Sequence, residues 1–242
     1  MSAALGRVAA LAGVALVAVG VSQPAFFSSS YWSTDGTLAW FGLVLALTAV
    51  PLALAGFVRA RTADGWLFAV GAVLVGYFGW LPAAIATHHW VGAGSGMWLT
   101  LAGAFLIAAG GAFAVIRSGN LRSTPAGLSS AALVAGIGIA LYFPGIFLNA
   151  DSGDSYWTGP FGHSLGVIML TLAILTAIVW AATVFVGGTR GADVALTLVV
   201  LGLVGYEPVS RALYSFDSLA SGAWIAFAGG VLAAVGTWSA RG

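Results

Sequence analysis

Long apolar runs separated by short polar stretches make up most of the chain. A helix that spans a membrane takes about 20 apolar residues. By hydropathy, eight segments qualify, approximately 4–22, 37–58, 65–87, 97–116, 126–148, 161–186, 194–213 and 219–239. The runs are continuously apolar, whereas the strands of a membrane barrel alternate apolar and polar residues. The pattern predicts an all-α, polytopic integral membrane protein with eight transmembrane helices.

The positions of the arginines predict the orientation of these helices. Seven of the eight basic residues lie at the chain ends or in connections that follow an even-numbered segment: Arg7, Arg59, Arg61, Arg117, Arg122, Arg190 and Arg241. With eight crossings, all seven fall on one side of the membrane. Since basic residues are enriched in cytoplasmic loops, we expect that side, and both termini, to be cytoplasmic.

The second half of the chain repeats landmarks of the first half in the same order. The matched pairs are Pro24 and Pro144, Tyr31-Trp32 and Tyr156-Trp157, Arg61-x-x-Asp64 and Arg190-x-x-Asp193, and Gly76-Tyr77 and Gly205-Tyr206. The order indicates two tandem four-helix units, residues 1–122 and 123–242. Four crossings return the chain to its starting side, so the two units would form a parallel repeat.

The first segment has a second interpretation. Arg7, the apolar run after it and Gln23-Pro24-Ala25 are also typical of a secretory signal peptide. The match of Pro24 to Pro144 favours a retained transmembrane helix, because a cleaved leader would not resemble an internal segment. Whether residues 1–25 are removed stays open at this point.

Composition supports a membrane location and excludes several functions. Hydrophobic residues make up 60% of the chain and charged residues 6%, with a mean hydropathy of +1.03. Soluble proteins are about one quarter charged, so we expect a lipid bilayer around most of this surface. Richness in Ala, Gly and Arg suggests a GC-rich genome, and we expect the plasma membrane, the inner membrane of a bacterium. A net charge of +1 gives no reason to expect nucleic acid as a partner.

The absence of two residue types limits which cofactors the chain can bind. The chain has no cysteine, which excludes disulfides and cysteine-ligated cofactors. It also has no lysine, because all eight basic residues are arginine, and a retinal Schiff base needs a lysine amine. The cofactors are otherwise unknown.

Prolines near the outer ends of the odd-numbered segments suggest a binding site. They are Pro24, Pro82, Pro144 and Pro208. Proline removes a backbone donor and disfavours helical geometry in the residue before it. These helices therefore either end early or kink outward, and a kink would open a vestibule lined by Tyr77, Tyr142, Tyr206 and Glu207.

Glu207 and Arg211 are ionisable residues inside the seventh segment. Their spacing of four residues allows an ion pair on one helix face near the interface. The alternative is a proton or ion site, since ionisable groups at membrane depth are often functional.

The three histidines, His88, His89 and His163, are expected near the outer surface. Imidazole and carboxylate groups suit zinc or copper. However, adjacent histidines point in divergent directions, and no His-x-x-x-His spacing is present. The residues are candidate metal ligands or solvated interfacial histidines.

Three functions follow from these patterns. The first is a channel or secondary permease for a small neutral or apolar solute. The second is a non-catalytic transmembrane subunit of a larger membrane complex. The third is an outer-face enzyme or metal-binding protein that uses the histidines, although no base–nucleophile spacing favours an enzyme. Whichever function holds, the candidate partners besides lipid are other membrane subunits or copies of the same chain.

Overall fold

The structure is a computed structural model. It describes residues 3–26, 28–34, 36–58, 61–85, 93–117, 128–151, 154–158, 162–186, 190–212 and 220–240, some of them by their backbone alone. Each predicted segment begins and ends within four residues of a helix in the structure. The helices are α1 (Ala3–Gly20), α2 (Tyr31–Thr34), α3 (Gly36–Phe57), α4 (Arg61–Ile85), α5 (Ser95–Arg117), α6 (Ser130–Phe147), α7 (Gly162–Phe185), α8 (Arg190–Ala212) and α9 (Ser221–Ser239).

Seven of the helices in the described part of the chain are long and apolar enough to cross a membrane. In α8 the apolar stretch is shorter and covers Ala192–Tyr206. Large apolar side chains such as Trp40, Ile178 and Phe185 are exposed on these helices. Exposing so much apolar surface is unfavourable in water and favourable in hydrocarbon. The chain is therefore a multi-pass integral membrane protein.

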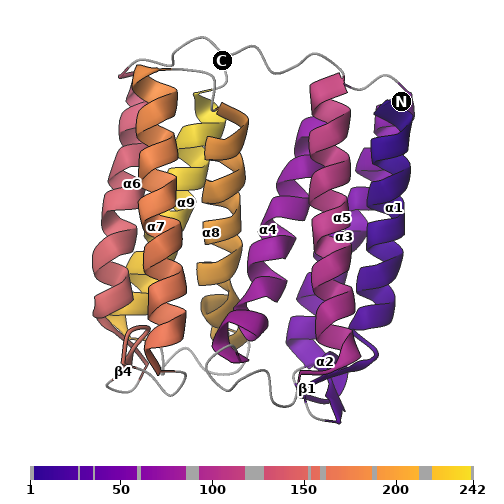
Figure 1. Cartoon of the computed structure of the whole chain (residues 1–242), viewed down its shortest axis with the longest axis horizontal. Helices are drawn as coiled ribbons and strands as arrows, with labels where there is room; N and C mark the ends of the chain where they lie inside the picture. The colour runs from indigo at the N-terminus through magenta and orange to yellow at the C-terminus, as the bar shows by residue number, and fades with distance from the viewer. Residues whose placement is uncertain are drawn as a thin grey trace. The chain divides into compact units, whose positions relative to one another are not determined.

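The chain divides into two compact units, Met1–Pro82 with His88–Leu121, and Ala83–Thr87 with Arg122–Gly242. In the first unit, α1 packs along α5 and beside α3 (Figure 1). In the second unit, α6 packs along α9, and α7 and α8 complete the bundle. In each unit, therefore, the first long helix packs along the last and also contacts the second.

Glycines bring the central helix pair of each unit into backbone contact. A Cβ atom on Gly13 of α1 would lie 2.5 Å from the carbonyl oxygen of Gly103 on α5. A Cβ atom on Gly229 of α9 would lie 2.7 Å from the carbonyl oxygen of Gly138 on α6. Lipid chains are as apolar as the helices, so close packing of small residues is a main source of association between them.

A short β-hairpin follows the first helix of each unit, and the hydropathy pattern did not predict it. In the first unit, β1 (Pro24–Phe26) pairs with β2 (Ser29–Ser30), and in the second, β3 (Asn149–Asp151) pairs with β4 (Asp154–Ser155). Pro24 pairs with Ser30 as Asn149 pairs with Ser155, so a shift of 125 residues relates both strands. Within each unit the hairpin lies at the end opposite the start of its first helix (Figure 1).

This register corrects the predicted match of Pro24 with Pro144. Pro24 lies in a strand because α1 has already ended at Gly20, whereas Pro144 lies inside α6. The helix continues for three residues beyond Pro144 and ends at Phe147, where the N–H of Leu148 donates to the carbonyl of Pro144. Pro82 and Pro208 likewise lie inside α4 and α8, three and four residues before these helices end.

Candidate functional site

A buried ion pair joins two helices of the first unit. Nε of Arg7 donates to Oδ1 of Asp64 at 2.9 Å, and Nη2 donates to Oδ2 at 2.8 Å. The side chain of Asp64 is 0% exposed and that of Arg7 is 14% exposed. Asp64 lies in the first turn of α4, where the helix dipole also favours a negative charge. Two parallel hydrogen bonds to one carboxylate offset much of the cost of removing both charges from water.

The residues around this pair leave room for the guanidinium. Its central carbon lies 5.4 Å from the centre of the Phe57 ring, within reach of a cation–π interaction. A Cβ atom on Gly56 would lie 2.5 Å from Nε of Arg7 and 2.8 Å from Oδ1 of Asp64. Glycine at position 56 is therefore part of the site, because a larger residue would displace the ion pair.

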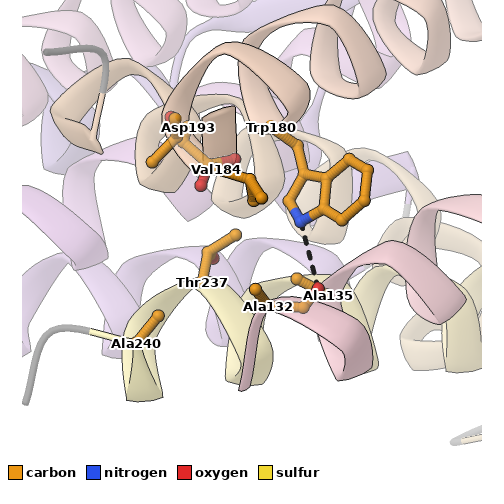
Figure 2. A pocket seen from close by; sticks show the side chains of 8 residues that line it. Ala132, Ala135, Trp180, Val184, Asp193, Thr237 and Ala240 are labelled. Atoms are coloured by element: carbon orange, nitrogen blue, oxygen red, sulfur yellow. Dashed lines mark hydrogen bonds between the residues drawn. The ribbon is translucent and has the colours of Figure 1, made fainter. Parts of the chain in front are cut away.

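The second unit buries the matching carboxylate, Asp193, in different surroundings. Asp193 lies in the first turn of α8 and is 4% exposed. It faces a small cavity lined also by Ala132 and Ala135 of α6, Trp180, Thr183 and Val184 of α7, and Thr237 and Ala240 (Figure 2). The cavity volume is about 10 Å³, which is close to the space that one water molecule needs.

Helix contacts identify the residue that corresponds to Arg7. Gly110 of α5 packs against the backbone of Gly6 and Ala10, and Gly236 of α9 packs against the backbone of Ala131 and Ala135. The shift between these contacts on α1 and α6 is 125 residues, the same as in the hairpins. Position 132 therefore corresponds to position 7, and the second unit has alanine where the first has arginine.

The indole of Trp180 takes up part of the space that this exchange leaves. Nε1 of Trp180 donates to the carbonyl oxygen of Ala132 at 3.1 Å, as Figure 2 shows. A Cβ atom on Gly136 would lie 2.8 Å from Cζ2 of the indole, so the ring lies directly on α6. The buried positions of α3 and α7 match with a shift of 127 residues, which pairs Trp180 with Ala53. A small residue on α3 thus accompanies the arginine, and a large residue on α7 accompanies the alanine.

Thr237 of α9 lines the cavity and contacts Thr197 of α8. The hydroxyls of Thr197 and Thr237 are 2.9 Å apart and both residues are buried. Each hydroxyl also bonds to its own helix, Thr197 to the carbonyl of Asp193 and Thr237 to that of Ala233. The second unit therefore concentrates a carboxylate, an indole N–H and two hydroxyls around one cavity.

Two of the predicted vestibule residues lie in the interiors of their own units. Tyr77 and Tyr142 are each 2% exposed, and Tyr77 contacts the rings of Phe41 and Phe78. Tyr206 is half-buried on α8. Glu207 and Arg211 also belong to α8, and their side chains lie outside the described part of the structure.

The predicted metal ligands fall largely outside the described residues. This holds for His88 and His89 entirely, and for the side chain of His163, the second residue of α7. Among the side chains that the structure describes, no three His, Asp or Glu residues gather as a metal-binding group.

The repeated tyrosines are buried at the hairpin end of each unit. Tyr31 and Tyr156 are each 5% exposed, and the ring of Tyr31 meets that of Phe78 edge-on at 5.7 Å. Burial raises the pKa of Tyr31 to about 12, while the nearby Thr100 hydroxyl acts in the opposite direction. The neighbouring Trp32 is less buried, so the Tyr-Trp pair divides between the core and the membrane interface.

Arg7, Asp64, Asp193 and Trp180 were not predicted as site residues. In the sequence, Asp64 and Asp193 indicated the internal repeat, and Arg7 indicated the orientation of the helices in the membrane. The position of each aspartate just inside a transmembrane helix could have identified the site, because a carboxylate at that depth needs a polar partner.

No protein-family model, curated protein or solved structure matches this chain.

Proposed function

We propose that the protein is a channel or secondary permease for a small neutral or apolar solute. The proposal rests on one observation. A cavity lies beside buried Asp193 in the second unit, whereas Arg7 occupies the corresponding space beside Asp64 in the first unit. Ionisable groups at membrane depth are expensive and mark transport pathways by default. In the first unit, the ion pair instead holds the starts of α1 and α4 together.

We extend the proposal to the finer membrane arrangement inferred from the sequence. The eight helices cross the plasma membrane as a parallel repeat of two four-helix units, 1–122 and 123–242, with both termini in the cytoplasm. The shared hairpin register and the shared order of helix contacts support the repeat. Asp64 and Asp193 then lie toward the cytoplasmic ends of their helices.

In this proposal, the outer vestibule forms only in a second conformation of the protein. Tyr77 and Tyr142 are buried in the structure, so a solute would reach them only when the helices of a unit separate at the outer end. The prolines at 82, 144 and 208 supply the weak points, because each removes one backbone hydrogen bond from its helix. Tyr206, Glu207 and Arg211 complete the proposed lining.

The first experiment separates a permease from a subunit of a larger complex. The protein is purified from its native membrane in mild detergent, and its mass is measured by native mass spectrometry. A single chain or a homo-oligomer supports the permease, whereas a second polypeptide in fixed stoichiometry supports the subunit. Zinc or copper retained in stoichiometric amount, and lost in a His88→Ala/His163→Ala variant, would instead support the metal-binding function.

The second experiment measures flux directly. Proteoliposomes are exposed to osmotic gradients of small neutral solutes, and the rate of swelling is followed by light scattering. We expect faster swelling than in empty liposomes for at least one solute, and loss of that rate in Asp193→Asn. A rate equal in Asp193→Asn and the unmodified protein would remove the second-unit cavity from the mechanism.

A further inference from the structure

An apolar groove runs between α1 and α5 on the surface of the first unit. It has a volume of about 150 Å³ and is lined only by apolar residues, among them Leu5, Ala9, Leu106, Ala109 and Phe113. The groove exists because Gly6 and Gly110 at its floor have no side chains and bring the two backbones into contact. Leu5 is 46% exposed and Leu106 is 37% exposed, so the groove is open to the surrounding bilayer.

A positive charge lies at one end of this groove. Arg117 is the last residue of α5, is exposed, and has its guanidinium carbon 5.3 Å from the centre of the Phe113 ring. Phe113 is itself part of the groove wall. The ring contact restrains the guanidinium at the point where the apolar groove meets the end of the helix.

A second arginine near this end does not add to that charge. Arg7 lies next to groove residue Gly6 in the sequence, but both hydrogen bonds of its guanidinium described above go to Asp64. The charge of Arg7 is thus balanced within the protein. Among the described residues beside the groove, Arg117 is left as the cation that a ligand in the groove can reach.

We propose that this groove binds an anionic phospholipid, with one acyl chain along α1 and α5 and the phosphate at Arg117. A flexible hydrocarbon chain fits an open apolar groove floored by glycine. The planar guanidinium presents two N–H groups that match two phosphate oxygens. A zwitterionic lipid has the same phosphate, but its own ammonium group offsets the charge, so the groove selects lipids with net negative charge. This inference is independent of the proposed transport function.

The test compares phosphatidylglycerol with phosphatidylcholine of identical acyl chains. The purified full-length protein is titrated with each lipid in detergent, and bound lipid is counted by native mass spectrometry. We expect tighter binding of phosphatidylglycerol to the unmodified protein. Arg117→Gln should weaken phosphatidylglycerol binding roughly five-fold and abolish the preference between the lipids, since one basic residue near an anionic surface contributes on this order.

A matched pair of variants tests the groove itself. Ala109→Phe fills the groove, while Ala140→Phe adds the same ring to an exposed position of α6, which has no residue in the groove lining. We expect Ala109→Phe to weaken binding of both lipids and Ala140→Phe to change neither. Ala109→Leu is a smaller substitution with the same expected direction, and circular dichroism confirms that each variant is folded.

Any of four results would overturn the proposal. The first two are equal binding of both lipids by the unmodified protein and an unchanged preference in Arg117→Gln. The third is equal binding by the Ala109→Phe and Ala140→Phe variants. The fourth is displacement of the lipid by inorganic phosphate alone, because the groove would then contribute nothing.

Discussion

Asp64 and Asp193 occupy matching positions in the two units but differ in their surroundings. Asp64 accepts hydrogen bonds from Nε and Nη2 of Arg7, and the pair leaves no room for a side chain at Gly56. Asp193 lies next to Ala132, the indole of Trp180 and a cavity of about 10 Å³. A single exchange, arginine for alanine on the first helix of each unit, accounts for most of this difference.

The difference shows how two similar four-helix units can place a buried carboxylate in different surroundings. A buried carboxylate is costly unless it is paired, so the first unit gains rigidity from its ion pair. In the second unit, large and small residues exchange places between two helices, and a small cavity stays open beside Asp193.

Removal of Arg7 should have the largest effect on stability. Arg7→Ala leaves the Asp64 charge buried without its partner, which costs roughly 3–5 kcal/mol. The free energy of unfolding in mixed detergent micelles measures this loss. Arg7→Ala/Asp64→Ala should recover most of it, and Arg117→Ala serves as the control because Arg117 is exposed. A double variant as unstable as Arg7→Ala alone would mean that the arginine acts through packing and not through its charge.

High pH should destabilise the protein through Tyr31. Burial raises the pKa of Tyr31 from 10 to about 12, so the folded state holds the phenol proton where the unfolded chain loses it. This contribution is fully present below pH 10 and is lost as the pH rises from 10 to about 12, at about 1.4 kcal/mol per pH unit. The unfolding free energy as a function of pH measures it. Tyr31→Phe should reduce the slope, and an unchanged slope would assign the effect to other groups.

Gly56 tests whether the ion pair needs the space next to it. Gly56→Ala places a methyl group 2.5 Å from Nε of Arg7, and crowding of this kind costs roughly 1–3 kcal/mol. Gly79→Ala is the matched control on α4, where a Cβ atom would meet nothing within 4 Å. Thermal unfolding of both variants should separate them clearly. Equal melting temperatures would show that the ion pair can move without cost.

The smallest effect is expected at the threonine pair of the second unit. Thr197→Val keeps the shape but removes the hydrogen bond to Thr237, and bonds of this kind between membrane helices contribute about 0.6 kcal/mol. The same unfolding assay measures the change. A loss of several kcal/mol would show that the polar groups around the cavity form one strongly coupled network.

The hydropathy pattern predicted the helices well because hydrocarbon leaves few alternatives for the backbone. Each hydropathy segment coincides with a helix, including α8 with its short apolar stretch. The hairpins were missed because Pro24–Phe26 and Asn149–Asp151 are too short to show an alternating pattern.

The Arg7–Asp64 pair was not predictable from the sequence for a different reason. The two residues are 57 positions apart, and no local spacing connects them. Their contact depends on how α1 and α4 pack, which the apolar pattern leaves open. The exchange of Arg7 for Ala132 became visible only when Gly6, Gly110 and Gly236 fixed the register of the helices.

The contrast between the two units depends on one equivalence: position 132 lies relative to Asp193 where position 7 lies relative to Asp64. A double-mutant cycle tests it most directly: Ala132→Arg in a Trp180→Ala background, with and without Asp193→Asn, followed by measurement of the unfolding free energy. If the positions are equivalent, the new arginine pairs with Asp193, and the cycle should give a favourable coupling of roughly 1–3 kcal/mol. A coupling of zero, in which Ala132→Arg costs the same with and without Asp193→Asn, would contradict the equivalence.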